Sequence, residues 1–265
     1  MVIRMIICTL ASSSSGNCTI VSQGNTHLLI DAGISLRRIK DGLRRVGLSV
    51  DDLTGVLVTH EHSDHISGIE MLIKYHKTPI FSSRGAGRGI LDAVPGAGPY
   101  INCFEMGAVF KMGDISVRSF MTPHDTIESA GYRLLAGGTT FAYVTDLGCV
   151  TDEVMDAASG ADIAIIESNH DRDMLKSGPY PPFLKRRILS KHGHLSNCDS
   201  GSFAARLVQS GTRFLQLSHL SCENNTPGLA RKTVENALIS NGIAVGHHVE
   251  LDVAPPFTPG RVYVL

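Results

Sequence analysis

The amino-acid sequence predicts an α/β fold in which two packed sheets carry helices on their outer sides. Short apolar runs of strand length recur from Val2 to Val264, and stretches with helical periodicity lie between them. Strand-rich stretches bounded by helices fit a layered sandwich. With 43% hydrophobic and 18% charged residues, the chain has ample material for a core. No Pro/Gly/Ser-rich linker separates two halves, so we expect one domain over residues 1–265.

The first third of the chain predicts strands followed by helices. Three short strands are expected, at residues 3–10, 19–22 and 27–30. An amphipathic helix is expected over residues 36–46, because Leu36, Ile39 and Leu43 share one face. A second helix should begin near His65 and continue through Ile73.

The rest of the chain supplies the second half of the predicted sandwich. The middle predicts a meander of strands with turns at Gly107, Gly113 and Gly137-Gly138. The last third alternates helix with strand. Its expected helices are residues 152–158, 182–189, 197–208 and 228–240. Its expected strands are residues 162–167 and 213–217.

A histidine-rich segment directly follows the apolar run 55–58 and places four potential metal ligands within six positions, namely His60, His62, Asp64 and His65. His60 and His62 alternate along an extended stretch, so both can face one cation. Asp64 and His65 lie on the following turn and can reach a second cation, which gives the two-metal arrangement of hydrolytic enzymes. The alternative is an exposed histidine-rich loop or a chance cluster. A folded chain, however, gains nothing from burying these groups together without a cation.

A two-metal site needs further ligands, and three residues at the ends of apolar, β-prone runs can supply them. His124 follows residues 119–123, Asp146 follows residues 139–145, and His219 follows residues 214–218. Taken singly, His124 or His219 could be an ordinary buried or loop histidine. Together with the cluster, these residues are expected to complete the site.

The ordered set resembles the metallo-β-lactamase-fold hydrolases. The match runs from Asp31 through the His-x-His-x-Asp-His signature at residues 60–65 to the three isolated residues described above. It implies a four-layer αββα sandwich of two mixed sheets with outer helices. It also implies that one metal is held by His60, His62 and His124, the other by Asp64, His65 and His219, and that Asp146 bridges them. The sequence does not follow lactamase-type enzymes, which use cysteine at the position of Asp146, or flavodiiron oxidoreductases, which carry glutamate at that of His62.

A narrower resemblance is to the WalJ/YycJ family of metallo-β-lactamase-fold proteins. It rests on the blocks at residues 10–18, 167–171, 193–197 and 217–225. One departure is Ser13, where that family's serine-rich turn is expected to have glycine. The resemblance implies a DNA exonuclease with DNA as its partner. Two other classes stay open: a small-molecule ester, thioester or cyclic-phosphate hydrolase, and a binding or regulatory protein that retains metal without turnover.

Residues 193–197 are expected to contact the substrate. Ser196 or Asn197 can cap the following helix, whose first turn would favour a phosphate, and His194 could contact the phosphate or protonate the leaving group. The alternative is that His194 only hydrogen-bonds its own loop. A formal net charge of −1 gives no general attraction to DNA, so a local patch with Lys185 and Arg187 is the expected contact, unless it is simply a solvated helix face.

The expected chemistry is metal-assisted hydrolysis, in which a water activated by the ions attacks the phosphorus atom. Asp64 and His194 are the expected catalytic residues. Ligands without thiolate admit zinc, manganese or iron. The six cysteines show no paired spacing, which favours free thiols and the cytoplasm, and no apolar run has the length of a membrane span.

Overall fold

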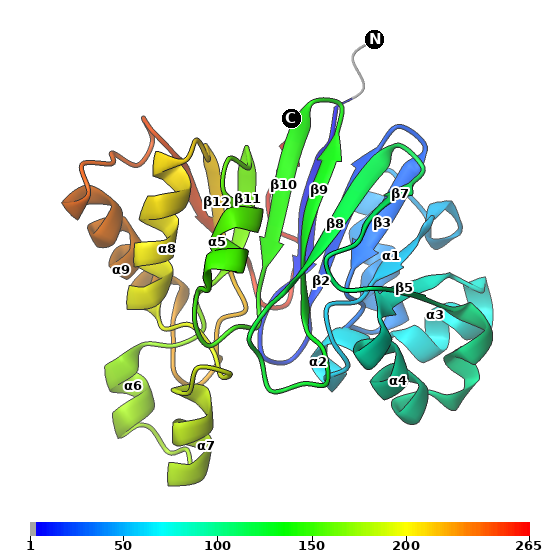
Figure 1. The fold of residues 1–265 in the computed structure, drawn as a ribbon, viewed down its shortest axis with the longest axis horizontal. Coiled ribbons are helices and arrows are strands. Elements are labelled where there is room, and N and C mark those ends of the chain that lie inside the picture. Colours follow the sequence, from blue (N-terminus) through cyan, green and yellow to red (C-terminus); the bar gives the residue numbers. More distant parts are fainter. Residues whose placement is uncertain (1–3) are drawn as a thin grey trace.

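The computed structural model describes residues 4–265 and contains two seven-stranded sheets packed against each other, with helices on the outer sides (Figure 1). The order in the first sheet is β14 (Val262–Val264), β1 (Ile6–Ala11), β2 (Cys18–Gln23), β3 (Thr26–Ile30), β4 (Gly55–Leu57), β5 (Ile80–Ser83) and β6 (Ile101–Phe104). The order in the second sheet is β13 (Glu250–Val253), β12 (Phe214–Ser218), β11 (Ile163–Glu167), β10 (Thr139–Val144), β9 (Ala130–Ala136), β8 (Ile115–Met121) and β7 (Val109–Met112). Each sheet mixes antiparallel and parallel pairs. The predicted α/β sandwich is confirmed.

The helices divide between the two sheets. Those that follow the first-sheet strands are α1 (Leu36–Arg45), α2 (Ser63–Ile66), α3 (Ile69–His76) and α4 (Arg84–Ala93). Those in the second half are α5 (Asp152–Ala158), α6 (Arg172–Ser177), α7 (Pro182–Ile188), α8 (Asn197–Gln209) and α9 (Pro227–Ser240). Figure 1 shows that α6 and α7 project from the lower end, and we call residues 172–188 the arm.

The core has three layers because strand side chains alternate between faces. Leu28 and Ile30 of β3 pack between the sheets, whereas Leu29 packs beneath α1. Likewise Ile165 of β11 lies between the sheets and Ile166 beneath the helices of the second sheet. Two sheets that are each buried on both faces explain why their strands appear in the sequence as continuous apolar runs.

Most predicted elements lie within a residue or two of their observed bounds, but some differ. Ile3, the first residue of the first predicted strand, lies outside the described residues. The single helix predicted from His65 is two helices, α2 and α3, separated at Gly68. A Cβ on Gly68 would lie 2.3 Å from the carbonyl oxygen of Ile34, so the close approach of the loop after β3 requires glycine there. Helices α4 and α6 and strand β5 were not predicted, and β6, β13 and β14 were predicted without bounds.

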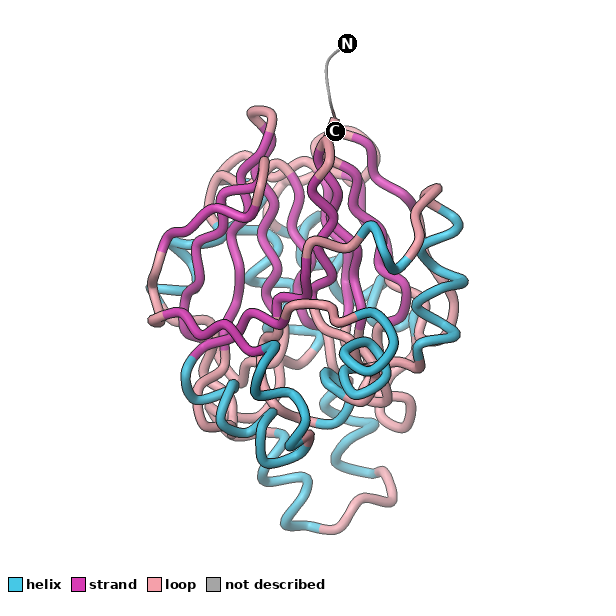
Figure 2. The backbone as a smooth tube through the Cα atoms, turned by 90° about the vertical axis from the view of Figure 1, so that its right-hand side faces the viewer, coloured by secondary structure: helices cyan, strands magenta, loops and turns pink. Residues whose placement is uncertain are grey.

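Loops and short helices from both sheets meet at the lower end (Figures 1 and 2). Three residues that follow strands there, Asp31, Asp146 and His219, have left-handed backbones with φ of 60°, 57° and 55°. Such a conformation is uncommon for residues other than glycine and is concentrated at functional sites. Within residues 4–265, none of the helices combines the length and apolar character needed to cross a bilayer.

Candidate metal centre

All seven predicted ligands meet at this end of the molecule, between the two sheets. His60, His62, Asp64 and His65 come from the loop after β4 and from α2, on the first sheet. His124, Asp146 and His219 follow β8, β10 and β12 of the second sheet. Their donor atoms form overlapping groups whose members lie within 4.8 Å of one another: His60, His62 and His124; His60, His65 and Asp146; and Asp64, His65 and His219.

The first group consists of histidines only. The Nε2 atom of His60 lies 3.0 Å from Nδ1 of His62, and the ring of His124 lies 5.0 Å from that of His60. Burial, together with neighbouring histidines, holds the pKa of His60 well below its ordinary value. Burial also lowers the pKa of His124. Neutral imidazole is the form of histidine that binds a metal.

The second group adds carboxylates. His219 Nε2 lies 3.3 Å from Asp64 Oδ2 and 3.4 Å from Asp146 Oδ1, and His65 Nε2 lies 3.3 Å from Asp64 Oδ2. Although burial opposes it, these carboxylates raise the pKa of His219 to about 10. Burial would also raise the pKa of Asp64, but His65 and His219 hold it far below its usual range. The carboxylates therefore require positive charge beside them, which a cation supplies by displacing the imidazole protons.

Two buried atoms show that the donor set fits divalent cations. Among the described residues, Nε2 of His124 and Oδ2 of Asp146 have no hydrogen-bond partner. A buried polar atom without a partner is costly, and an acceptor that faces other acceptors is explained by an ion between them. Imidazole and carboxylate ligands suit zinc, manganese and iron.

Residues behind the ligands fix their orientation. The Nδ1 atom of His65 donates to Asp31 Oδ2 over 2.7 Å, and Asp31 Oδ1 accepts from the backbone N–H of Thr59 over 2.8 Å. His124 Nδ1 donates to the carbonyl oxygen of Gly193 over 3.1 Å. These bonds leave Nε2 of both histidines as the ligand atom, which is how proteins usually set the tautomer of a metal-binding histidine.

Glu167 joins the centre to the predicted proton donor. Its Oε1 accepts from Nδ1 of His194 and from Nδ1 of His219, each over 2.8 Å, and its Oε2 accepts from the backbone N–H of Leu195 over 2.8 Å. Burial opposes ionisation of Glu167, but His194 and His219 lower its pKa. No role is predicted for Glu167 from the sequence. It ends an apolar strand just as Asp31 follows one, and this signal could have identified both.

The other predicted substrate residues lie in different surroundings. Arg187 forms an ion pair with Asp125, the neighbour of His124, so it lies at the rim of the centre. The ammonium group of Lys185 donates to two carbonyl oxygens, of Lys176 and Gly178, each over 2.7 Å. Lys185 therefore holds α6 against α7.

Ser196 and Asn197 are both buried. Ser196 caps α8, as expected, by accepting from the backbone N–H of Asp199. Asn197 accepts from the hydroxyl of Ser168 over 2.7 Å and bonds Asn225. Ser13 is also buried and accepts from the N–H of Gly16 over 3.1 Å, so the serine-rich turn closes without glycine at that position.

One side of the centre is open to solvent. The side chain of Asp64 is 20% exposed and that of His194 is 17% exposed, whereas those of His65, His124, Asp146 and His219 are nearly fully buried. A substrate must therefore approach past Asp64 and His194. A cleft of about 570 Å³ adjoins His124 and is bordered by Glu128, Asp152 and Glu153.

Comparisons with known proteins agree with this geometry. Residues 26–219 match the family model described as the beta-lactamase superfamily domain. The chain is 36% identical over 256 residues to the exodeoxyribonuclease YycJ of Bacillus anthracis, covering 96% of each chain. It is 36% identical over 259 residues to the exodeoxyribonuclease WalJ of Streptococcus pneumoniae, covering 94% of this chain and 96% of WalJ. The crystal structure of the metallo-beta-lactamase fold protein YhfI from Bacillus subtilis superimposes with a TM-score of 0.75 at 18% identity, covering 99% of this chain and 100% of YhfI.

Proposed function

The chain belongs to the beta-lactamase superfamily, and within it to the family of the exodeoxyribonucleases YycJ and WalJ, and from this membership we propose that it is a DNA exonuclease that uses two divalent metal ions. One ion would be held by His60, His62 and His124. The other would be held by Asp64, His65 and His219. Asp146, whose carboxylate lies near histidines of both sets, would contact both ions.

The side chains around the ions divide the work of phosphodiester hydrolysis. Bound divalent cations would supply a nucleophile at neutral pH and neutralise charge on the phosphoryl oxygens. Asp64 lies on the open side and orients the attacking group. His194 donates a hydrogen bond from Nδ1 to Glu167, which leaves Nε2 free to carry a proton to the leaving oxygen. Glu167 keeps this imidazole in the required tautomer.

The observation that carries the proposal is the position of His194. A histidine that is not a predicted ligand lies with its Nδ1 4.0 Å from Asp146, is held by the same carboxylate as the ligand His219, and is partly exposed. A site that only stores metal has no need of an oriented proton donor on its open side.

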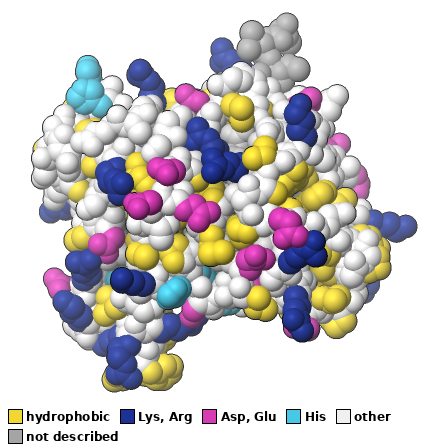
Figure 3. Space-filling model, in the orientation of Figure 1, with side chains coloured by type: hydrophobic (Ala, Val, Ile, Leu, Met, Phe, Trp, Pro, Cys, Tyr) yellow, Lys and Arg dark blue, Asp and Glu magenta, His cyan; other side chains and the backbone are white. Residues whose placement is uncertain are grey.

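The arm provides the expected contact surface for DNA. Figure 3 shows Lys and Arg side chains gathered over this part of the molecule. Its cations and those beside it are Arg172, Lys176, Lys185, Arg186, Arg187 and Lys191. Because the formal net charge of the chain is −1, attraction to a polyanion must be local. We assign Arg187 to phosphate contact and Lys185 to holding the arm in position.

A small-molecule ester, thioester or cyclic-phosphate hydrolase is the second candidate. The observation in its favour is the cleft beside His124, because its acidic border disfavours a polyanion and its volume suits a small ligand. We also place the enzyme in the cytoplasm, since its six cysteines form no disulfide.

The two candidates are separated by incubating the purified protein, loaded with zinc or manganese, with end-labelled DNA and with small ester, thioester and cyclic-phosphate substrates. Stepwise release of nucleotides that is abolished in His62→Ala is expected. Cleavage of the small substrates alone would replace the exonuclease with the second candidate.

A further inference from the structure

A pocket of about 230 Å³ lies beside the metal centre. Its apolar walls include Leu220, Ala254, Pro256 and Phe257, and its polar edges include Ser12 and Asn225. Within the described chain, none of the residues that line it carries a formal charge at neutral pH. Apolar walls with a few hydroxyl and amide groups at the edge are typical of pockets for uncharged, ring-shaped ligands.

One wall of the pocket belongs to the loop that carries the predicted ligand His219. Leu220 directly follows the predicted ligand His219, and consecutive Cα atoms are about 3.8 Å apart. The backbone N–H of His219 also donates to the hydroxyl of Ser12 over 2.7 Å, so one side chain contacts both the pocket and the ligand loop. A group in the pocket therefore lies against the loop that carries a predicted metal ligand.

Phe257 is presented to the pocket by a fixed loop. Its ring is 57% exposed. Prolines at 255, 256 and 259 restrict the backbone around it. The loop is tied on one side by the N–H of Ser12, which donates to the carbonyl oxygen of Pro255 over 3.2 Å. On the other side, Arg45 of α1 donates to the carbonyl oxygen of Pro259 over 2.9 Å. A loop whose backbone is held in place before binding loses little entropy when a ligand packs on its side chain.

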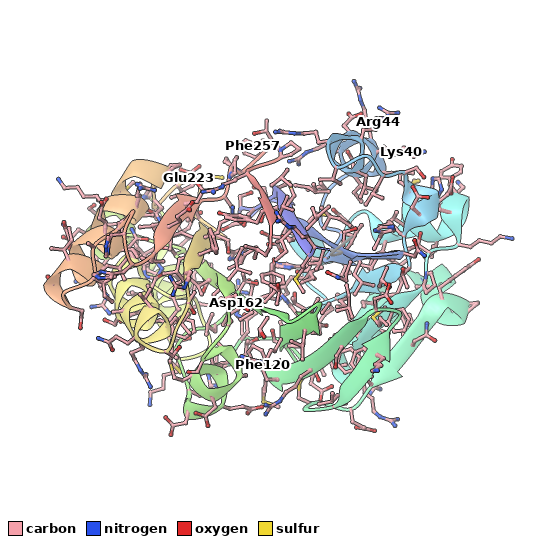
Figure 4. All side chains as sticks on the ribbon, turned by 90° about the horizontal axis from the view of Figure 1, so that it is seen from above. Lys40, Arg44, Phe120, Asp162, Glu223 and Phe257 are labelled. Carbon is pink, nitrogen blue, oxygen red and sulfur yellow. The ribbon has the colours of Figure 1, made fainter. Side chains whose placement is uncertain are left out.

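The charges near Phe257 differ between its two sides. Figure 4 shows Phe257 at the same margin of the molecule as Glu223 on one side and Arg44 and Lys40 of α1 on the other. The bond from Arg45 to the Phe257 loop confirms that α1 adjoins it. Phosphates of a bound strand would therefore follow α1, away from Glu223.

We propose that this pocket receives a nucleobase of the DNA strand next to the phosphate at the metal centre, with Phe257 stacking on the base. The inference rests on the DNA exonuclease function proposed above. The faces of a base are apolar and suit the apolar walls of the pocket, whereas a phosphate would lose its hydration there without a cation in return.

The test measures release of the first nucleotide from short oligonucleotides in which one abasic nucleotide is placed at each position in turn. In the wild-type, metal-loaded protein an abasic nucleotide at one position should raise KM about tenfold. Phe257→Ala should raise KM for the intact strand about as much and be insensitive to the abasic nucleotide at that position. Phe257→Trp should retain the wild-type pattern, and so should Tyr75→Ala, which removes an exposed ring from α3.

A Phe257→Ala protein that responds to the abasic series as the wild type does would overturn the base pocket and leave the exonuclease function intact. If the wild type releases no nucleotide from any DNA, the proposed function fails. Whether the pocket binds a base is then tested by photocrosslinking a phosphorothioate oligonucleotide that contains 5-iododeoxyuridine. A crosslink on the peptide that contains Phe257 would support the inference, and the absence of this crosslink would overturn it. If light scattering shows that Phe257→Ala changes the particle mass while its KM for DNA stays at the wild-type value, the pocket binds a second copy of the chain. This result would also overturn the inference.

Discussion

The metal centre and the arm lie next to each other, yet they are built in opposite ways. In the centre, donor atoms from both sheets are buried, and most are oriented by a further residue such as Asp31 or Glu167. The arm, in contrast, is largely exposed and held by a few contacts, among them the bonds from Lys185 to two carbonyl oxygens and the ion pair of Arg187 with Asp125. The chemistry of hydrolysis thus depends on groups that cannot move independently. The proposed contact with DNA would depend on groups that can move.

The largest expected effect comes from removing one ligand. His62→Ala should lower the bound metal content from two ions toward one. It should lower the rate of DNA hydrolysis by more than about 100-fold, because loss of residues that merely support ligands already costs about 10–100-fold. Elemental analysis and nucleotide release measure the two quantities. His247→Ala, at an exposed histidine in a turn remote from the centre, is the matched control. Unchanged metal content in His62→Ala would contradict the assignment of the first metal.

The next effect comes from the carboxylate behind the ligands. Glu167→Gln should lower kcat about 10–100-fold, because both His194 and His219 lose their charged partner. Adding His194→Ala to this variant should cost less than it does in the wild type, since the two residues act together. Glu223→Gln, at an exposed acid, serves as the control. If the losses in kcat from the two substitutions are strictly additive, His194 and Glu167 do not act together.

His170 lies where the chain passes from the centre into the arm, and its protonation makes the free energy of unfolding depend on pH. Burial lowers the pKa of His170 from 6.5 to about 4. Between these values the unfolded chain binds a proton that the folded chain does not, so stability falls as the pH decreases from 6.5 toward 4. The loss should reach about 3 kcal/mol below this window.

Urea unfolding in the presence of a chelator, at a series of pH values, measures this dependence. His170→Gln should make the curve less steep across the acidic window, with the remaining slope coming from His60 and His124, whose pKa values are also lowered. His247→Gln should leave the curve unchanged. A His170→Gln curve that keeps the full wild-type slope would show that other groups govern acid stability.

The smallest effects are expected in the arm. Arg187→Ala should weaken DNA binding several-fold at low salt and reduce the slope of affinity against salt concentration by about one phosphate contact. Lys185→Ala should leave that slope unchanged, because its ammonium group already donates to two carbonyl oxygens. Fluorescence anisotropy across a salt series compares the two. If the slope of DNA affinity against salt concentration is the same for both variants and the wild type, the arm does not contact DNA.

The sequence predicts the centre better than the arm for a physical reason. His60 to His65 and the residues at 124, 146 and 219 each follow apolar runs that set their positions in the sheets. No roles were predicted for Glu167 and Asp31, because the sequence does not distinguish a carboxylate that binds a metal from one that hydrogen-bonds a metal-binding histidine. The distinction depends on the partner, which only the structure shows. The position of Lys185 could not be predicted, since a basic residue on a short helix can point to solvent or to a carbonyl with nearly the same sequence pattern.

The fold shows the same division. Strands with continuous apolar runs were predicted nearly to their ends, whereas β13 and β14 and the short helix α6 were not. The break at Gly68 depends on how closely the loop after β3 approaches, which is a tertiary contact. That the 265 residues form one domain stays a prediction.

Ligands drawn from both sheets have a consequence for the integrity of the molecule. An ion bound by residues of both sheets would act as a non-covalent cross-link between the sheets, which otherwise pack through their apolar interface. Its binding energy adds to the cohesion of the folded state whenever the free metal concentration exceeds the dissociation constant. At a low free metal concentration the protein would therefore lose stability against unfolding and proteolysis as well as activity.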